Sequence, residues 1–218
     1  MGIKENLTKI KEQIGNNNVK IIAVTKYATE EGINEVCQKG IHDFGESYVQ
    51  DALEKQKRLK NLENIRWHFV GRLQKNKVKY VVNNFNLIHS VDSVELANVI
   101  NKTANRRGVI QEILLQVNIT QEVTKTGFSP NTLEDEFAKI KDLTNIRPIG
   151  LMTMATNTSD TSMSKDCFLK LVRLREALSK RYMVNLKELS MGMSNDYKIA
   201  VECGSTMVRL GRAIFKGG

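Results

Sequence analysis

The sequence contains few of the residues that would indicate a secreted, metal-binding or membrane protein. It has three cysteines and two prolines among 218 residues. Cys37, Cys167 and Cys203 are far apart and odd in number, so we expect neither a disulfide framework nor a metal site. No apolar run approaches the roughly 20 residues that a membrane-spanning helix needs. The N-terminus also lacks the apolar core of a signal peptide, and we expect a cytoplasmic protein without a membrane partner.

Linkers and nucleic-acid motifs are missing as well. No Pro-, Gly- or Ser-rich segment divides the chain, so residues 1–218 are expected to form one domain. With 41% hydrophobic and 26% charged residues, the chain can bury a sizeable core. The net charge of +9 favours anionic partners, but the lysine-rich runs at 55–60 and 72–79 have no interleaved aromatic residues. We interpret these runs as solvated helix faces, and nucleic-acid binding as the weaker alternative.

What the sequence does contain is a regular alternation of short apolar runs and amphipathic segments. A helix is predicted at residues 3–14, with Gly15 as its stop signal. Strands are then predicted at residues 20–25, 41–45, 66–71, 86–91, 113–117, 148–152, 186–190 and 206–210, with helices between them. One of these helices is predicted to open at Ser129-Pro130, with proline at its first position, and another to begin at Lys165. Eight such units predict a single (β/α)8 barrel of the TIM type with an extra N-terminal helix. A doubly wound open sheet is the alternative, although no G-x-G-x-x-G follows the first strand.

The segment Ile21-Ile22-Ala23-Val24-Thr25-Lys26 indicates where chemistry is expected. Its branched apolar residues suit a strand that is buried on both faces. A lysine seldom closes such a strand, because ammonium groups are costly to remove from water. Either Lys26 has reached an exposed strand end, or it is an amine held away from water that forms a Schiff base with a carbonyl ligand. The segment alone leaves both interpretations open.

In a closed barrel the carboxyl ends of all strands meet at one mouth, and several polar residues would join Lys26 there. Ser190 closes the seventh strand, Arg209 lies on the eighth, and Gly211 and Arg212 begin a short helix after it. Barrels often bind phosphate with the loops after strands seven and eight and with a short extra helix. An amine, an anion cradle and a guanidinium that faces a pyridine nitrogen describe a pyridoxal 5′-phosphate site. We therefore predict this cofactor and no metal.

Two connections of the predicted barrel are longer than the others, at residues 119–129 and 155–164. Both are expected at the mouth, where binding sites and lids are built. Met154, just before the second connection, is expected to pack beside the ligand. His68 on the third strand is interpreted as a hydrogen-bonded barrel histidine rather than a catalytic base. No residue is predicted to be catalytic.

Several motifs resemble those of a known family. They are Ala23-Val24-Thr25-Lys26, Phe44-Gly45-Glu46, residues 68–77, His89-Ser90-Val91-Asp92-Ser93, residues 150–155, Leu189-Ser190-Met191-Gly192-Met193-Ser194 and residues 204–211. In order and spacing, from about residue 20 to 216, they are similar to the YggS/PROSC family of pyridoxal-phosphate homeostasis proteins. The resemblance implies a fold-type III barrel, like the N-terminal domain of alanine racemases, with Lys26 carrying the cofactor as an internal aldimine. One departure is Ser47, where the family usually has asparagine, so the hydrogen bond of that amide is not expected here.

Two functions from different classes are compatible with this site. The first is a carrier or buffer of pyridoxal 5′-phosphate, and the second is an amino-acid racemase or decarboxylase. Arg209 would discourage protonation of the ring nitrogen, which weakens the cofactor as an electron sink. Racemases of this fold take a second base from an additional β domain, and this sequence ends at Gly218. With what the resemblance implies, we expect a monomeric homeostasis protein, not an enzyme, that can pass its cofactor to apoenzymes.

Overall fold

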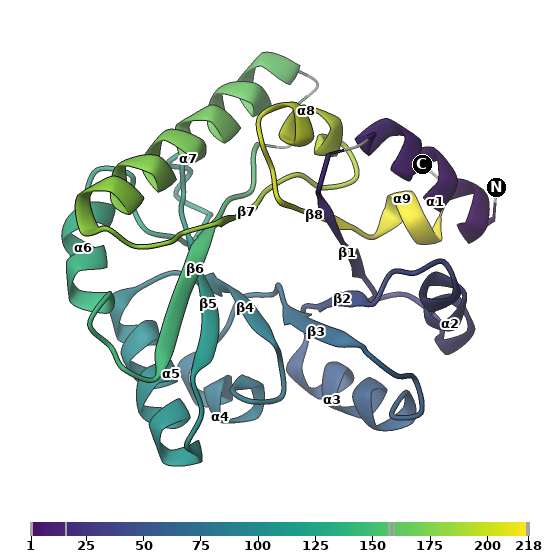
Figure 1. Ribbon diagram of the computed structural model, residues 1–218, viewed down its shortest axis with the longest axis horizontal. Helices are drawn as coiled ribbons and strands as arrows, with labels where there is room; N and C mark the ends of the chain where they lie inside the picture. Colours follow the sequence, from purple (N-terminus) through teal and green to yellow (C-terminus); the bar gives the residue numbers. More distant parts are fainter. Residues whose placement is uncertain (1, 16, 157, 159, 217–218) are drawn as a thin grey trace.

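The strands form a closed barrel in which every neighbouring pair is parallel. The computed structural model describes residues 2–15, 17–156, 158 and 160–216. Its strands follow one another around the barrel in chain order, and the last pairs with the first (Figure 1). They are β1 (Lys20–Val24), β2 (Asp43–Glu46), β3 (Arg66–Phe69), β4 (Leu87–Val91), β5 (Gln111–Gln116), β6 (Ile146–Met152), β7 (Glu188–Ser190) and β8 (Met207–Leu210). The predicted (β/α)8 barrel is confirmed, and the open-sheet alternative is wrong.

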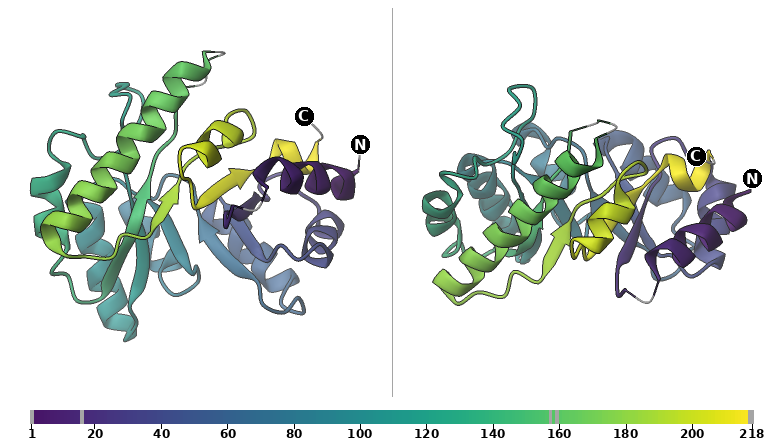
Figure 2. Two further views of the ribbon diagram at one scale, coloured as in Figure 1. Left: turned by 45° about the horizontal axis from the view of Figure 1, so that its top comes forward. Right: turned by 90° about the horizontal axis from the view of Figure 1, so that it is seen from above.

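Helices form the layer around this barrel. The extra N-terminal helix is α1 (Ile3–Ile14), which packs against α9 (Arg212–Phe215), so the first and last helices lie side by side (Figure 2). The helices between strands are α2 (Glu30–Gln38), α3 (Val49–Arg58), α4 (Val78–Val81) preceded by the 3-10 turn η1 (Lys75–Lys77), α5 (Val94–Arg107), α6 (Leu133–Ile140), α7 (Thr161–Tyr182) and α8 (Tyr197–Glu202). Each strand therefore leaves its carboxyl end at the same mouth, as the prediction of a shared site requires.

Two helices begin away from their predicted starts. Pro130 was expected at the first position of a helix, but it lies in a turn, and the Leu133 N–H donates to the Ser129 carbonyl at 2.9 Å where the helix begins. The helix expected from Lys165 begins earlier, because the side chain of Asp160 caps its N-terminus by accepting a backbone hydrogen bond. Both differences lie in the long connections at the mouth.

The barrel encloses a small apolar core of its own. Side chains alternate along each strand, so one set packs outward under the helices and the other fills the lumen. The buried inward apolar residues are Ile22, Leu87, Leu114, Ile149, Met152 and Met207. Full burial of one such side chain contributes about 1.5–3 kcal/mol. The rest of the lumen holds polar side chains, which are described with the site.

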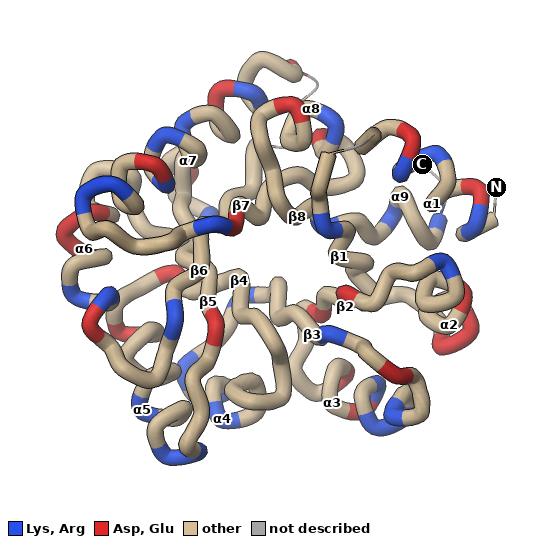
Figure 3. Tube along the Cα trace, viewed as in Figure 1, with Lys and Arg blue, Asp and Glu red and all other residues tan. Residues whose placement is uncertain are grey.

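Basic and acidic residues are interspersed over the outer helices (Figure 3). Lys55, which the sequence placed in a solvated basic run, is an exception, because it is 8% exposed and pairs with Glu46. Within the described residues, no helix is long and apolar enough to cross a membrane, and no cluster of His, Cys, Asp or Glu could hold a metal ion. The three cysteines are free thiols.

Candidate functional site

Lys26 lies two residues beyond the end of β1, at the mouth of the barrel. Residues 26 and 27 form a turn, closed by a hydrogen bond from the Ala28 N–H to the Thr25 carbonyl at 3.0 Å. The Lys26 side chain is exposed, and its ammonium lies 4.9 Å from the centroid of the Tyr27 ring. In the described part of the chain, no carboxylate forms an ion pair with it. Of the two interpretations left open by the sequence, the structure supports the exposed strand end, and the amine is accessible to a ligand.

The backbone that leads to Lys26 is fixed from the outer side of the barrel. Thr25 Oγ1 donates to Glu46 Oε1 at 2.5 Å, and Lys55 Nζ donates to the Thr25 carbonyl at 2.7 Å and to the same carboxylate. Thr25 and Glu46 are fully buried. A buried ion pair persists where hydrogen bonds satisfy its remaining polar atoms, as these do for one carboxylate oxygen. The contacts set the direction in which the chain leaves β1.

Arg209 is a buried cation near the same mouth. Its Cα lies beside Ile22 of β1, and its side chain extends to the carboxyl ends of β6 and β7. Nη2 donates to the Thr153 carbonyl at 2.9 Å, and Nη1 donates to the carbonyl and the hydroxyl of Ser190 at 2.8 and 2.6 Å. Burial lowers the pKa of Arg209 to about 10, so the side chain stays charged at neutral pH. Among the described residues it has no ion-pair partner, which leaves its charge for a ligand to compensate.

Ser190 lies behind Arg209 rather than open to the mouth. Its side chain is fully buried, and its hydroxyl contacts His89 Nδ1 at 2.9 Å in addition to Arg209. The structure thus brings two of the predicted site residues together, with the hydroxyl already in two hydrogen bonds. Its role as a donor to phosphate stays a prediction.

Gly211 approaches the end of β1. A Cβ atom at this position would lie 3.2 Å from the carbonyl oxygen of Val24, closer than most side chains tolerate. Glycine therefore allows the loop after β8 to lie against the strand that carries Lys26. The predicted cradle and the predicted amine therefore lie at the ends of neighbouring strands, β8 and β1.

The loops after β7 and β8 are joined by two contacts. The Ala213 N–H donates to Ser194 Oγ at 3.1 Å, and Arg212 Nη2 donates to Asn195 Oδ1 at 3.4 Å. Ser194 was not singled out from the sequence, because its place beside α9 depends on the path of a loop that has no repeating pattern. It adds a hydroxyl to the predicted phosphate cradle.

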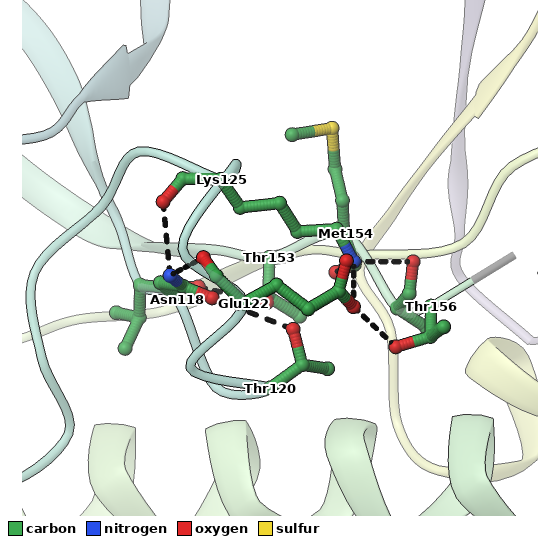
Figure 4. Close-up of polar contacts among 9 residues, drawn as sticks. Asn118, Thr120, Glu122, Lys125, Thr153, Met154 and Thr156 are labelled. Carbon is green, nitrogen blue, oxygen red and sulfur yellow. Dashed lines mark hydrogen bonds and ion pairs between the residues drawn. The ribbon is translucent and has the colours of Figure 1, made fainter.

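The two long connections are fastened to each other on the opposite rim. Lys125 Nζ donates to Glu122 Oε1 at 2.7 Å and to the Ala155 carbonyl at 3.3 Å, and Thr156 Oγ1 donates to the same carboxylate at 2.5 Å (Figure 4). The hydrogen bond from Lys125, with that from Thr156, lowers the pKa of Glu122 to about 2. We call Glu122, Lys125 and Thr156 the rim latch. Met154 lies beside it, half-buried against the lumen core, where the ligand was predicted.

The family comparisons agree with this geometry. Residues 2–217 match the family described as alanine racemase, N-terminal domain. A pyridoxal phosphate homeostasis protein of Aquifex aeolicus is 38% identical over 224 residues, covering 99% of this chain and 98% of the relative. One from Synechocystis is 37% identical and covers 91% of each chain. The fold and the mouth define a barrel of the alanine racemase N-terminal class.

Solved structures show which members of this class the chain resembles in sequence and fold. PipY of Synechococcus elongatus superposes with a TM-score of 0.93 at 34% identity, covering 98% of this chain and 99% of PipY. PipY with pyridoxal phosphate bound gives 0.90 at 33% identity, with the same coverage. An alanine racemase of Clostridium difficile gives 0.80 at 16% identity over 56% of its own chain, a likeness of fold alone. This chain belongs to the family of pyridoxal phosphate homeostasis proteins.

Proposed function

We propose that this chain binds pyridoxal 5′-phosphate at the barrel mouth and serves intracellular cofactor homeostasis as a carrier or buffer. One observation carries the proposal: an accessible amine, Lys26, shares a mouth with a buried guanidinium, Arg209, that lacks a carboxylate partner among the described residues. The names of the relatives, and PipY with its cofactor bound, support it. The residues present fit a ligand that carries an aldehyde, a phosphate and an acceptor nitrogen.

The residues that meet the ring have separate roles in this proposal. Lys26 would hold the cofactor through its amine, and the reactive group that the cofactor would supply is its aldehyde. Arg209 would donate a hydrogen bond to the ring nitrogen, since guanidinium groups donate and never accept. Met154 borders the ring from the rim of β6. The exposure of Lys26 supports reversible attachment, because water and free amines reach it.

The phosphate is assigned to the junction of the last two loops. Gly211 lets backbone N–H groups approach the anion, and Arg212 supplies positive charge at the start of α9. Ser194 is placed to add a hydroxyl. Ser190 completes the predicted set of cofactor-binding residues, with its hydroxyl held between His89 and Arg209.

We also propose that the bound cofactor undergoes no sustained turnover. A donor at the ring nitrogen keeps the ring unprotonated, which makes it a weak electron sink. Racemisation removes a proton from one face and returns it to the other, so it needs two positioned groups, and Lys26 is the one placed at the ring. In this proposal a monomer in the cytoplasm exchanges cofactor with apoenzymes.

Absorbance of the purified protein, loaded with pyridoxal 5′-phosphate, tests the binding. We expect a visible band that borohydride removes, with the reduced pyridoxyl group mapped to Lys26. Protein without such a band after loading would refute the proposal. Incubation with L-alanine in deuterated water tests turnover, and steady Lys26-dependent deuterium incorporation at Cα would identify a racemase-like enzyme instead.

A further inference from the structure

A line of hydrogen-bonded side chains crosses the inside of the barrel. Asp43 Oδ1 on β2 lies 2.9 Å from His68 Nε2 on β3, and His68 Nδ1 lies 3.0 Å from His89 Nε2 on β4. His89 Nδ1 lies 2.9 Å from Ser190 Oγ on β7, to which Arg209 on β8 also donates. We call Asp43, His68, His89 and Ser190 the lumen relay. All four side chains are buried, so the hydrogen bonds have no competition from bulk water.

The two ends of the lumen relay fix the direction of every hydrogen bond in it. A carboxylate accepts and cannot donate, so His68 Nε2 carries a proton. A neutral His68 then accepts at Nδ1, and His89 Nε2 carries the proton between the two rings. His89 Nδ1 accepts in turn, which commits the one proton of Ser190 to it. At the other end Arg209 is a donor, and the Ser190 oxygen accepts from it.

The surroundings keep both imidazoles neutral, as this direction requires. Burial lowers the pKa of His68, and the opposing effect of Asp43 does not outweigh it. Burial is the largest cause that lowers the pKa of His89 well below its ordinary value, and electrostatic repulsion from His68, Arg209 and Lys20 acts in the same direction. A proton added to the His89 ring would be repelled by Lys20 on β1 and by Arg209 on β8.

Asp43, the carboxylate at one end of the lumen relay, forms a further ion pair. Arg66 Nε and Nη2 donate to the two oxygens of Asp43 at 2.8 and 2.6 Å. Burial pushes the pKa of Asp43 upward, but the hydrogen bonds from Arg66 and His68 outweigh it and hold the pKa well below its ordinary value. Asp43 is therefore an ionised acceptor across the physiological range.

We propose that His68 and His89 are positioning residues, which turn the Ser190 proton away from the mouth and hold the Ser190 oxygen as an acceptor for Arg209. Nη1 of Arg209 is then fixed by Ser190 and Nη2 by the Thr153 carbonyl. The guanidinium N–H groups of Arg209 that do not donate to Ser190 or Thr153 are thereby kept in one orientation, available to the ligand. The relay thereby selects a ligand group that accepts a hydrogen bond and disfavours one that carries a proton, because two donors would face each other.

Nitrogen-15 NMR of the cofactor-free protein tests the relay directly. The chain has three histidines, so the signals are few. At neutral pH we expect His68 and His89 each to carry a proton on Nε2 and none on Nδ1. We also expect the guanidinium N–H groups of Arg209 to exchange slowly with water. A protonated Nδ1 on either histidine would overturn the assignment.

A matched pair of substitutions separates positioning from space filling. His89→Gln keeps an amide that can donate toward His68 and accept from Ser190, whereas His89→Leu removes both functions. We expect His89→Gln to keep the slow exchange at Arg209. Its affinity for pyridoxal 5′-phosphate should stay within about threefold of that of the unmodified protein, a smaller change than the loss of one hydrogen bond would cause. We expect His89→Leu to lose the slow exchange and to bind roughly tenfold or more weakly.

The outcomes distinguish the relay from the proposed function. The affinity comparison rests on the proposed function, and the NMR measurements do not. If the unmodified protein retains no cofactor, the proposed function fails while the tautomers and the Arg209 exchange still decide the relay. Equal affinity losses in His89→Gln and His89→Leu, or unchanged Arg209 exchange in a folded His89→Leu, would overturn the positioning role.

Discussion

Two lysines on the mouth side of the barrel are held in opposite states. Lys26, after β1, is exposed, and its described neighbours include an aromatic ring but no paired carboxylate. Lys125, after β5, is tied to Glu122 and directed at the carbonyl oxygens of the loop after β6. Both amines can reach a ligand in the mouth by their place in the chain. They differ in whether the amine is already committed to partners.

The two amines differ both in exposure and in partners, because Lys26 is exposed and unpaired whereas the Lys125 side chain is 21% exposed and paired with Glu122. The backbone before Lys26 is fixed by Thr25, Glu46 and Lys55, while the amine is left free. In the rim latch the amine of Lys125 itself forms the contacts. A lysine with a fixed backbone and a free amine suits reversible covalent attachment, whereas a lysine whose amine is held by a carboxylate suits a structural role.

The largest expected effect comes from removing the free amine. Lys26→Ala should abolish the visible band and the borohydride-reducible adduct, because Lys125, the other lysine of this comparison, is held by the rim latch. Peptide mapping after borohydride reduction measures this. Lys125→Ala is the matched control and should keep the adduct on Lys26. An adduct found mainly on Lys125 or Lys77 in the unmodified protein would show that Lys26 is not the reactive amine.

The second prediction removes the support of the free amine. Lys55→Met leaves the fully buried carboxylate of Glu46 without its partner and should lower the free energy of unfolding by about 3–5 kcal/mol. Urea unfolding, followed by the fluorescence of the single tryptophan, Trp67, measures it. The double variant Glu46→Gln/Lys55→Met removes both charges and should recover part of the loss. A change below about 0.5 kcal/mol in the single variant is what a solvated lysine would give.

Much of this architecture could be predicted from the sequence, because local patterns determine it. Alternation of apolar runs and amphipathic segments located all eight strands and therefore the common mouth. The end of the first predicted strand put Lys26 at the mouth. Helix starts near the long connections were misplaced, since Pro130 fits both a turn and a helix start and only the fold decides between them.

The contacts within the site could not be predicted in the same way. The lumen relay joins His89 to Ser190, 101 positions apart, and depends on strand register and barrel closure. Lys55 looked like part of a basic surface because its buried partner, Glu46, lies on another element. The inward-facing histidines on two neighbouring strands were a usable signal, but the direction of the proton needs both Asp43 and Arg209 in place.

The third prediction frees the committed amine. Glu122→Gln removes the ion pair of Lys125 and keeps the size of the side chain. In a Lys26→Ala background it should raise borohydride-trapped labelling of Lys125 by roughly two- to fivefold, since an exposed ion pair holds its amine only weakly. Mass spectrometry of the Lys125 peptide measures this. Thr156→Val, which loses a hydrogen bond but no ion pair, is the control and should change the labelling less.

The smallest expected effect is the titration of the rim latch. The pKa of Glu122 is lowered from its ordinary 4.5 to about 2, with the Lys125 hydrogen bond as the largest cause. Because the folded-state pKa is the lower one, the contribution of the latch is fully present above about pH 4.5 and is lost as the pH falls through about 2. Carbon-13 NMR of the Glu122 carboxyl group should show this titration. In Lys125→Met the pKa should return toward its ordinary value, and a normal pKa in the unmodified protein would mean that the rim latch is open in solution. Lys125 would then be as free as Lys26, and the difference between the two amines would have to come from the backbone beneath them.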